Sequence, residues 1–345
     1  MSSSSGDSNS STSTSYGAPD GHFGPACDGD RVGKYTLSQR IGRGQYGLIW
    51  SVHDSPEKVL KILRADEDAE EDVENEKRIL ERLRSTHVVA LLDAFEHKTD
   101  EDVPHSVLVF ARADHDLFHL LHDDGTVKME RSTMQRLIQQ LLRAVDFLRE
   151  KNVVHLDLKP ENILLFHGDA RLCDFGTARI MPSDAPEYGQ TIEYRALEMI
   201  LEDPVGFAAD VWSIGCVVYE ILTAAEGTRT ATLFEPRDVV VEFEDEEADD
   251  VVDRTHLCLC VELFGPLPRH ITRRFKHLFT MRGTVRGLSH PIDPTTSLWD
   301  LMRDDGLSAA AADAWSAFLR LFFEYSPRRR VQCLADVCGH ELLTT

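Results

Sequence analysis

Basic residues are scarce in this chain. Lys and Arg number 37 among 345 residues, against 59 Asp and Glu, so the formal net charge is -22 at pH 7. A surface with this charge repels the phosphate backbone of nucleic acids and attracts basic partners. We therefore expect no direct binding of nucleic acid.

Paired cysteines and a hydrophobic leader are also missing. The seven cysteines are odd in number and scattered, without a C-x-x-C pair, which is typical of reduced thiols inside a cell. No Lys or Arg precedes Arg31 and no apolar run lies near the start, so we expect no secretory signal. The longest mostly apolar run, "VWSIGCVVYEIL", is too short to cross a bilayer and predicts a buried helix. These absences favour an intracellular protein of the cytoplasm, the nucleus or both, without membrane contact.

Three regions of the chain differ in composition. Residues 1–33 form a Ser-rich tail with nine serines in the first twenty positions, and we expect it to be disordered because it has little to bury. Residues 34–110 contain short apolar or β-branched runs between turn residues, such as "YTLSQRIG", "KVLKIL" and "SVLVFA", which predict antiparallel strands. Residues 111–345 have a mainly helical pattern, and one long helix is expected to begin with Ser132 or Thr133 as its N-cap.

The stretch "IGRGQYGLIW" has the spacing G-x-G-x-x-G at Gly42, Gly44 and Gly47. A dinucleotide-binding turn has the same spacing, but there the glycines open a helix, whereas the strand-like "LIWSV" follows here. This context favours a glycine-rich hairpin that covers nucleotide phosphates, with an ordinary surface hairpin as the alternative. The residues expected to bind the nucleotide through this hairpin are Ile41, Gly42, Arg43, Gly44, Gln45, Tyr46, Gly47, Leu48 and Ile49.

The most specific signal is "HLDLKPEN", residues 155–162, followed by "CDFG". Phosphoryl transfer depends mainly on positioning and on charge neutralisation. Asp157 is expected to accept or orient the proton of the attacking hydroxyl, and Lys159 to neutralise charge on the transferred phosphoryl group. Asn162 and Asp174 are expected to hold Mg2+ against the nucleotide.

Together these motifs resemble the eukaryotic-type protein kinases over nearly everything but the tail. Further matches are "YRALEMI", where Glu198 takes the place of the A-P-E glutamate, "ADVWSIGC" with Asp210, and "SPRRR", where Arg330 is placed to form an ion pair with Glu198. The resemblance implies an α+β, bilobal protein kinase fold. A small antiparallel-sheet N-lobe would comprise residues 34–110, and the hinge with a larger, mainly helical C-lobe would comprise residues 111–345.

The resemblance also implies further site residues. Lys61 of "KVLKIL" takes the place of the lysine that contacts the α- and β-phosphates of ATP, and Glu76 is the glutamate expected to pair with it. Phe110 takes the gatekeeper position, and the backbone of Ala111 and Ala113 is expected to bind the adenine edge. ATP and Mg2+ are the implied cosubstrate and cofactor.

Two features are similar to the group that contains cyclin-dependent, mitogen-activated and SR-protein kinases: Tyr194-Arg195 before the A-L-E triplet, and the long insert after the "VWSIGC" helix. Within that group, "TLFEP", the acidic run and "LCLCVELFGPLPRHITRRFKHLFTMRG" most resemble the SR-protein kinases, which phosphorylate serines in arginine/serine-rich proteins. The sequence departs from them in having D-F-G rather than D-L-G and in lacking a long spacer between the lobes. We therefore expect a monomeric serine/threonine kinase with a basic, arginine/serine-rich protein substrate.

Leu156 stands where many kinases have an arginine that pairs with a phosphorylated residue of the activation segment. Leucine cannot make this pair. Our hypothesis is that the activation segment, residues 174–198, is ordered by packing, and that Tyr188 within it stays unmodified.

The insert at about residues 235–290 contains an acidic run, since residues 242–253 hold eight carboxylates and no base. Their field would attract an arginine-rich chain, and a solvated loop is the equal alternative. Two other functions stay open. One is a kinase of the same group with proline-directed or other specificity, and the other is a pseudokinase scaffold that binds partners without transferring phosphate.

Overall fold

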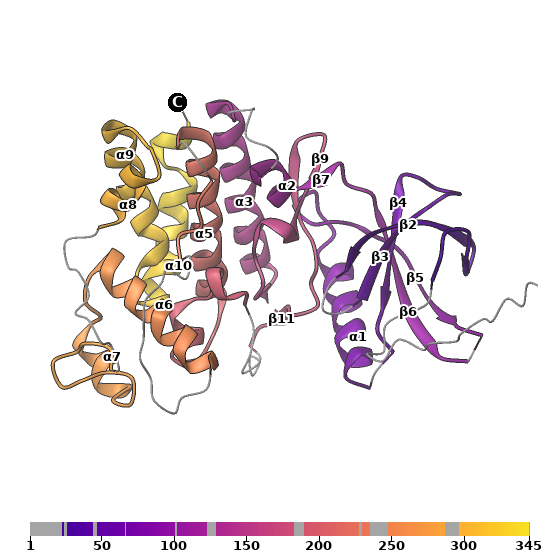
Figure 1. Cartoon of the computed structure of the whole chain (residues 1–345), viewed down its shortest axis with the longest axis horizontal. Coiled ribbons are helices and arrows are strands. Elements are labelled where there is room, and N and C mark those ends of the chain that lie inside the picture. Colours follow the sequence, from indigo (N-terminus) through magenta and orange to yellow (C-terminus); the bar gives the residue numbers. More distant parts are fainter. Residues whose placement is uncertain are drawn as a thin grey trace, which may run out of the picture. The chain divides into compact units, whose positions relative to one another are not determined.

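The structure is a computed structural model (Figure 1). It describes residues 23, 26–43, 47–65, 67–100, 102–122, 129–182, 190–227, 230–234, 248–286 and 297–344, with the side chains of 67–72 and 248–252 left out. Its residues form two units. The smaller unit comprises Met1–Glu74 and Leu91–Arg112, and the larger unit comprises Asn75–Ala90 and Ala113–Thr345.

The smaller unit is built on a six-stranded antiparallel sheet with the strand order β1-β2-β3-β4-β6-β5. Its strands are β1 (Arg31–Val32), β2 (Tyr35–Arg43), β3 (Gly47–Val52), β4 (Lys58–Leu63), β5 (Leu91–Lys98) and β6 (Pro104–Ala111). Side chains of β5 alternate between more and less exposed positions, as expected for a strand with one face on a core. The apolar face of the sheet buries Leu37, Leu60, Ile62, Val107 and Val109 completely.

The end of the Ser-rich tail departs from the expected disorder. Residues 26–33 are part of the fold, because β1 pairs with β2 and the amide of Gly29 donates to the carbonyl of Leu37 at 2.9 Å. Phe23 is buried against the sheet, with its ring 5.2 Å from that of His105 and 5.7 Å from that of His97. A single aromatic ring and Val32 therefore tie this part of the tail to the sheet. The rest of the predicted tail lies outside the described residues.

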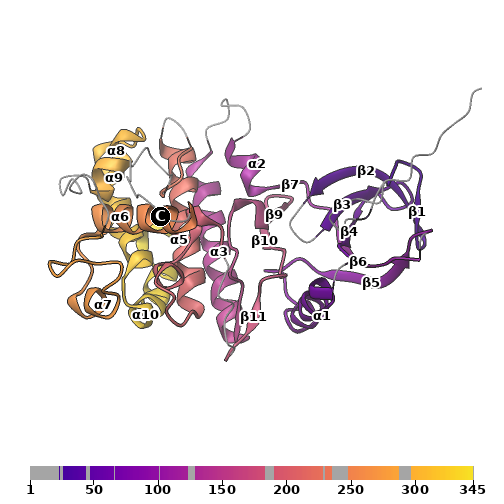
Figure 2. The same cartoon turned by 60° about the horizontal axis from the view of Figure 1, so that its bottom comes forward.

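The larger unit is mainly helical (Figures 1 and 2). Its helices are α2 (Leu117–His122), α3 (Arg131–Glu150), α4 (Leu197–Ile200), α5 (Phe207–Glu226), α6 (Ala248–Phe264), α7 (Arg269–Arg274), α8 (Leu298–Asp304), α9 (Ala309–Arg320) and α10 (Pro327–Cys338). The unit also contains the short strands β7 (His115–Asp116), β8 (Val153–Val154), β9 (Ile163–Phe166), β10 (Asp169–Leu172) and β11 (Arg179–Ile180). Strand β9 pairs with β7 and with β10, and β8 pairs with β11. Helix α1 (Glu67–Arg82) crosses the division between the units.

Helix α5 is the core of the larger unit and lies beside α3 and α10 in both views. It is longer than the apolar run from which it was predicted, and its length and hydropathy would suit a membrane span. However, 89% of its most apolar window is buried inside the protein. Trp212 of this helix is fully buried, with its ring 5.0 Å from that of Phe323 and 5.7 Å from that of Phe234. The prediction of a buried helix is confirmed.

Two sequence-based boundaries are wrong. Helix α3 begins at Arg131 with Glu130 as N-cap, and neither Ser132 nor Thr133 caps it. The extended backbone of Glu130 ends the preceding segment, and its carbonyl accepts the amide of Met134 at 3.0 Å. The helix therefore begins two or three residues earlier than predicted, and the first buried residue of its apolar stripe is Met134.

The second boundary concerns residues 75–90, which were expected in the N-lobe. They belong to the larger unit because their backbone and side chains bond there. The amide of Val89 donates to Leu172 O at 2.9 Å, the amide of Leu172 donates to His87 O at 2.9 Å, and Arg82 Nε donates to Lys151 O at 2.9 Å. These bonds join distant parts of the sequence, so periodicity alone does not reveal them.

The packing of Phe23 leads to a test. Replacing Phe23 by Ala is expected to lower the free energy of unfolding by about 3 kcal/mol, because a buried ring is removed and a cavity is left. Val103→Ala, at a 37% exposed position of the same unit, is the matched control and should change it by less than about 0.5 kcal/mol. Denaturant unfolding measures both, and equal effects would show that Phe23 does not contribute to the fold.

Candidate active site

The loop that follows β8 is held by one buried carboxylate. Asp210, in the first turn of α5, accepts the backbone amide of His155 at 2.7 Å and that of Leu156 at 3.0 Å. Asp210 is 2% exposed, and burial raises the pKa of its carboxyl, opposed by His155 and by the two amide donors. Leu156 itself is 1% exposed and has a φ of 64°, which is rare for a branched side chain. The two bonds from Asp210 therefore compensate for a strained backbone conformation.

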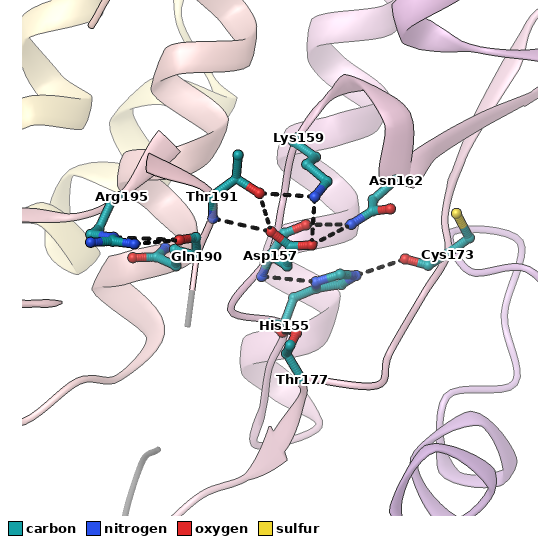
Figure 3. A network of polar contacts seen from close by, with 9 residues as sticks. All are labelled: His155, Asp157, Lys159, Asn162, Cys173, Thr177, Gln190, Thr191 and Arg195. Carbon is teal, nitrogen blue, oxygen red and sulfur yellow. Dashed lines mark hydrogen bonds and ion pairs between the residues drawn. The ribbon is translucent and has the colours of Figure 1, made fainter. Parts of the chain in front are cut away.

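Asp157 lies at the centre of a polar network in the larger unit (Figure 3). Its Oδ1 accepts the hydroxyl of Thr191 at 2.8 Å and the amide of Thr191 at 3.2 Å. Its Oδ2 accepts Asn162 Nδ2 at 3.0 Å and forms an ion pair with Lys159 Nζ at 2.9 Å. Lys159 Nζ also donates to the hydroxyl of Thr191 at 2.8 Å. The network fixes the orientation of a carboxylate that keeps 18% of its side chain exposed, as a proton acceptor requires.

Asn162 is held on both sides. Its Nδ2 also donates to the backbone carbonyl of Asp157 at 2.7 Å, and the backbone carbonyl of Asn162 accepts the amide of Cys173 at 3.0 Å. Because the amide nitrogen is occupied by Asp157, the side-chain oxygen is the atom available to a cation. Asp174 follows Cys173 directly and has a φ of 59°.

His155 joins this loop to the segment that carries Asp174. Its Nδ1 accepts the amide of Asp157 at 3.3 Å, so its Nε2 donates to the carbonyl of Cys173 at 2.9 Å. Its ring lies 4.7 Å from that of Phe175, which is fully buried, and its carbonyl accepts the hydroxyl of Thr177 at 2.9 Å. Asp157, Asn162 and Asp174 are therefore positioned by one connected set of bonds.

Gln190 connects the loop to the segment before α4. Its amide donates to the carbonyl of Leu156 at 2.9 Å, and its φ of 65° turns its own carbonyl towards Arg195, which donates to it at 3.3 Å from Nη2 and 3.4 Å from Nε. The buried side chain donates to Ser213 Oγ at 2.8 Å and accepts the amide of Ala196 at 2.9 Å. The backbone carbonyl of Gln190 thus satisfies donors of Arg195, and its uncharged side chain satisfies the amide of Ala196.

Arg195 extends the connection to α6. Its Nη1 donates to Asp253 Oδ1 at 2.7 Å, and both side chains are about a quarter to a third exposed. His256, one turn further along α6, is 3% exposed, and burial together with the Arg195 cation lowers the pKa of its imidazole to about 3. His256 is therefore neutral beside Arg195, and the anionic partner of Arg195 is Asp253.

The expected ion pair between Glu198 and Arg330 is confirmed. Arg330 Nη1 lies 2.7 Å from Oε1 and 3.0 Å from Oε2 of Glu198, and both side chains are buried. Arg330 also donates to the carbonyl of Ala208 at 2.9 Å, and its guanidinium lies 4.9 Å from the ring centroid of Trp212. This pair fixes α4 against the core of the larger unit.

The expected nucleotide-binding residues of the smaller unit lie on its sheet. Gly42 pairs with Ile49 and Arg43 with Leu48 across β2 and β3, so the two strands form the expected hairpin. A Cβ on Gly47 would lie 2.3 Å from the carbonyl of Ile62, which explains the glycine. The outer residue Ile41 is 44% exposed. Gly44, Gln45 and Tyr46 lie outside the described residues.

The remaining predicted residues are divided between the units. Lys61 of β4 is 8% exposed and pairs with Ile49, and Ala111 ends β6 in the same unit. Glu76, which is 2% exposed, and Ala113 belong to the larger unit. The pairing of Lys61 with Glu76 and the binding of a nucleotide by these residues stay predictions.

Sequence reasoning missed several residues that shape the site: His155 as a bridge, Thr177, Gln190 and Thr191. Thr191 is 34 residues away from its partner Asp157, so no local spacing marks it. The only available signal was its place in the segment between "CDFG" and "YRALE".

Asp210 offers a test of how the loop is held. Asp210→Ala would leave two buried amides without an acceptor, and we expect the free energy of unfolding to fall by about 3 kcal/mol. Asp304→Ala, at an exposed position of α8, is the control and should have almost no effect. Denaturant unfolding followed by circular dichroism distinguishes them, and similar small effects for both would contradict the role of Asp210.

Comparison with known proteins identifies the family. Residues 35–263 match the family model described as the protein kinase domain. Mouse serine/threonine-protein kinase 36 is 32% identical over 212 residues, which are 59% of this chain and 16% of that protein. Mouse cyclin-dependent kinase-like 4 is 33% identical over 206 residues (55% of this chain, 57% of that protein), and Drosophila melanogaster serine/threonine-protein kinase fused is 33% identical over 199 residues (55% and 24%). The chain thus spans less than two thirds of each relative. With the family model covering more than half of it, and with the predicted α+β class confirmed, the chain belongs to the protein kinase domain family.

Proposed function

We propose that the protein transfers the γ-phosphoryl group of ATP to serine or threonine hydroxyls of protein substrates. The observation that carries this proposal is the fixed, partly exposed carboxylate of Asp157, with Lys159 2.9 Å away and Asn162 bonded to the same oxygen. Membership of the protein kinase domain family and the similarity to serine/threonine kinases support it.

Asp157 and Lys159 divide the work on the reacting groups. Asp157 accepts the hydrogen of the attacking hydroxyl and directs the oxygen towards the phosphorus. Lys159 places a positive charge where the transferred group carries its negative charge. Thr191 bonds to both side chains and keeps them in register. A positioned set of this kind supplies catalysis without a covalent intermediate.

The donor set fits Mg2+. This ion prefers carboxylate and carbonyl oxygens. Asn162 offers an amide oxygen, and Asp174 of "CDFG", twelve positions further along the chain, offers a carboxylate. Bound there, the ion would neutralise charge on the nucleotide phosphates. In the smaller unit, Lys61 and the β2–β3 hairpin are the residues proposed to hold those phosphates.

We further propose that the substrate is basic and arginine/serine-rich. The net charge of -22 and the eight carboxylates of residues 242–253 favour a positively charged chain. Residues 242–247 of this acidic run lie outside the described residues, and Asp253 at its end pairs with Arg195. The relatives include a kinase named cyclin-dependent kinase-like 4, so a kinase with other specificity is the second candidate.

The setting proposed for this activity is the cytoplasm or nucleus, with the protein acting as a monomer. All seven cysteines are free thiols, which supports a reducing compartment.

The experiment is phosphate transfer from Mg-ATP to an arginine/serine-repeat peptide and to a Ser-Pro peptide. We expect preference for the repeat peptide, and a fall of about 10²- to 10⁴-fold in kcat for Asp157→Ala. Thermal unfolding checks that the variant is folded. Preference for the Ser-Pro peptide would overturn the substrate class. Undiminished transfer by the variant would overturn the mechanism, and no transfer to any protein by the wild type would favour the scaffold.

The acidic run can be tested separately. Replacing the carboxylates of residues 242–247 by their amides is expected to raise KM for the repeat peptide several-fold at low salt and less at 0.15 M salt. The KM for a neutral peptide should not change. Equal effects on both peptides would mean that the run is a solvated loop without a part in substrate binding.

A further inference from the structure

A basic surface interrupts this acidic protein. Between Glu262 and Asp293 the sequence contains no carboxylate, although Asp and Glu are otherwise abundant. We call residues 269–286 the basic segment. It comprises α7 and the turn that follows, and its six Arg and Lys side chains all belong to exposed residues: Arg269, Arg273, Arg274, Lys276, Arg282 and Arg286.

Most of these cations form no ion pair with another described residue. Arg274 forms an ion pair with Asp203 at 2.7 Å, and Arg286 Nε donates to the carbonyls of Lys276 and Phe279. Within the part of the chain that the structure describes, the side chains of Arg269, Arg273, Lys276 and Arg282 have no ion-pair partner. Exposed cations on one short segment raise the local positive potential, which favours the approach of an anionic ligand.

The basic segment is also firmly built. Phe279 and Val285 pair as an isolated bridge and are buried, which anchors the turn between them. Across the turn, the amide of Thr280 donates to the carbonyl of Thr284 at 2.8 Å, and the amide of Gly283 donates to Thr280 O at 2.9 Å. A ligand that binds a surface already ordered in this way loses less free energy to ordering.

Apolar features accompany the charge. Met281 lies at the tip of the turn and is fully exposed. A cavity of about 190 Å³ lies beside α7, with Ile271, Phe275, Leu197 and Leu201 in its lining. The carboxylates of Glu198 and Asp203 also line it, and they form ion pairs with Arg330 and Arg274. It is smaller than the roughly 300–1,000 Å³ of small-molecule pockets, so a single side chain suits it better. Met and Arg are enriched in protein interfaces, and the basic segment exposes both residue types.

We propose that the basic segment is a docking surface for an Asp/Glu-rich segment of a partner protein that also carries one aliphatic or aromatic anchor residue. The cations are spread from Arg269 to Arg286 along the chain. This spread matches several single carboxylates along a peptide, whereas a phosphate group is recognised by cations that converge on one point. A long nucleic acid would extend beyond the patch onto the acidic remainder of the protein, while charges more than about 8 Å away hardly affect a short peptide at physiological salt.

The test uses the full chain and a fluorescent peptide with one Leu between Asp and Glu residues. Its control peptide has Asn and Gln in their place. Binding is followed by anisotropy at low and at physiological salt. We expect the acidic peptide to bind, the amide peptide to bind at least tenfold more weakly, and R269E/R273E/K276E to lose at least tenfold in affinity for the acidic peptide.

A matched variant reverses three charges elsewhere. R131E/R136E/R143E changes the exposed arginines of α3 and should leave the affinity within about twofold, apart from long-range screening effects. Neither triple variant touches Asp157 or its partners, so phosphate transfer to a non-acidic peptide should be retained by both. This readout separates a failure of docking from a failure of the proposed kinase activity.

Several outcomes would overturn the proposal. One is that the wild type does not bind the acidic peptide at a protein concentration 100-fold above the peptide concentration needed to detect the label. The others are equal binding of the acidic and amide peptides, and equal losses of affinity in the two triple variants. Tighter binding of a phosphoserine peptide, of an RNA oligonucleotide or of anionic vesicles than of the acidic peptide would assign the surface to that ligand instead.

Discussion

The buried carboxylate of Asp210 is the constraint on which the candidate active site depends. By accepting the amides of His155 and Leu156, it holds the loop in a conformation that leucine would otherwise avoid. Asp157 follows directly, and its place relative to Lys159 and Asn162 is set by that turn of the backbone. Because Asp210 lies on α5, which is almost wholly buried inside the larger unit, the site inherits the rigidity of the core.

Leu156 lacks the positive charge of the usual arginine, but it also makes contacts that support the segment. Its side chain is buried, and its carbonyl accepts the amide of Gln190. Gln190 in turn satisfies Arg195 through its carbonyl, and Arg195 reaches Asp253 of α6. In kinases with a phosphorylated segment, the phosphate group would accept from donors of this kind. Here the donors of Arg195 already have unmodified residues as partners. This arrangement supports the hypothesis that the segment is ordered without phosphorylation. Tyr188 itself lies outside the described residues.

The parts that sequence predicted well are those in which chemistry or local packing dictates residue type. The motif "HLDLKPEN" marked Asp157, Lys159 and Asn162, which the structure brings into one network. Their roles in phosphoryl transfer, and that of Asp174 of "CDFG", stay predictions. Apolar runs marked the central strands and α5 for the same local reason.

The missed parts depend on contacts between distant residues. Thr191 and Gln190 became evident only through bonds to Asp157, Leu156 and Ser213. Phe23 is one of two aromatic residues, with Tyr16, in a Gly- and Ser-rich tail, and its burial is decided by the sheet on which it packs. Net charge was equally uninformative about the basic segment, since an average over the chain conceals a local excess of the other sign.

Our hypothesis is that the buried hydrogen bonds from Asp210 through Leu156 to Gln190 hold the site in its working geometry without any phosphate. The most direct measurement compares initial rates of phosphate transfer to a peptide substrate by two samples of the protein. In one, intact mass shows that no phosphate is attached, and the other has first been incubated with Mg-ATP. We expect equal rates from the first turnover. A lag, or a rate at least tenfold higher after incubation that phosphatase treatment reverses, would contradict it.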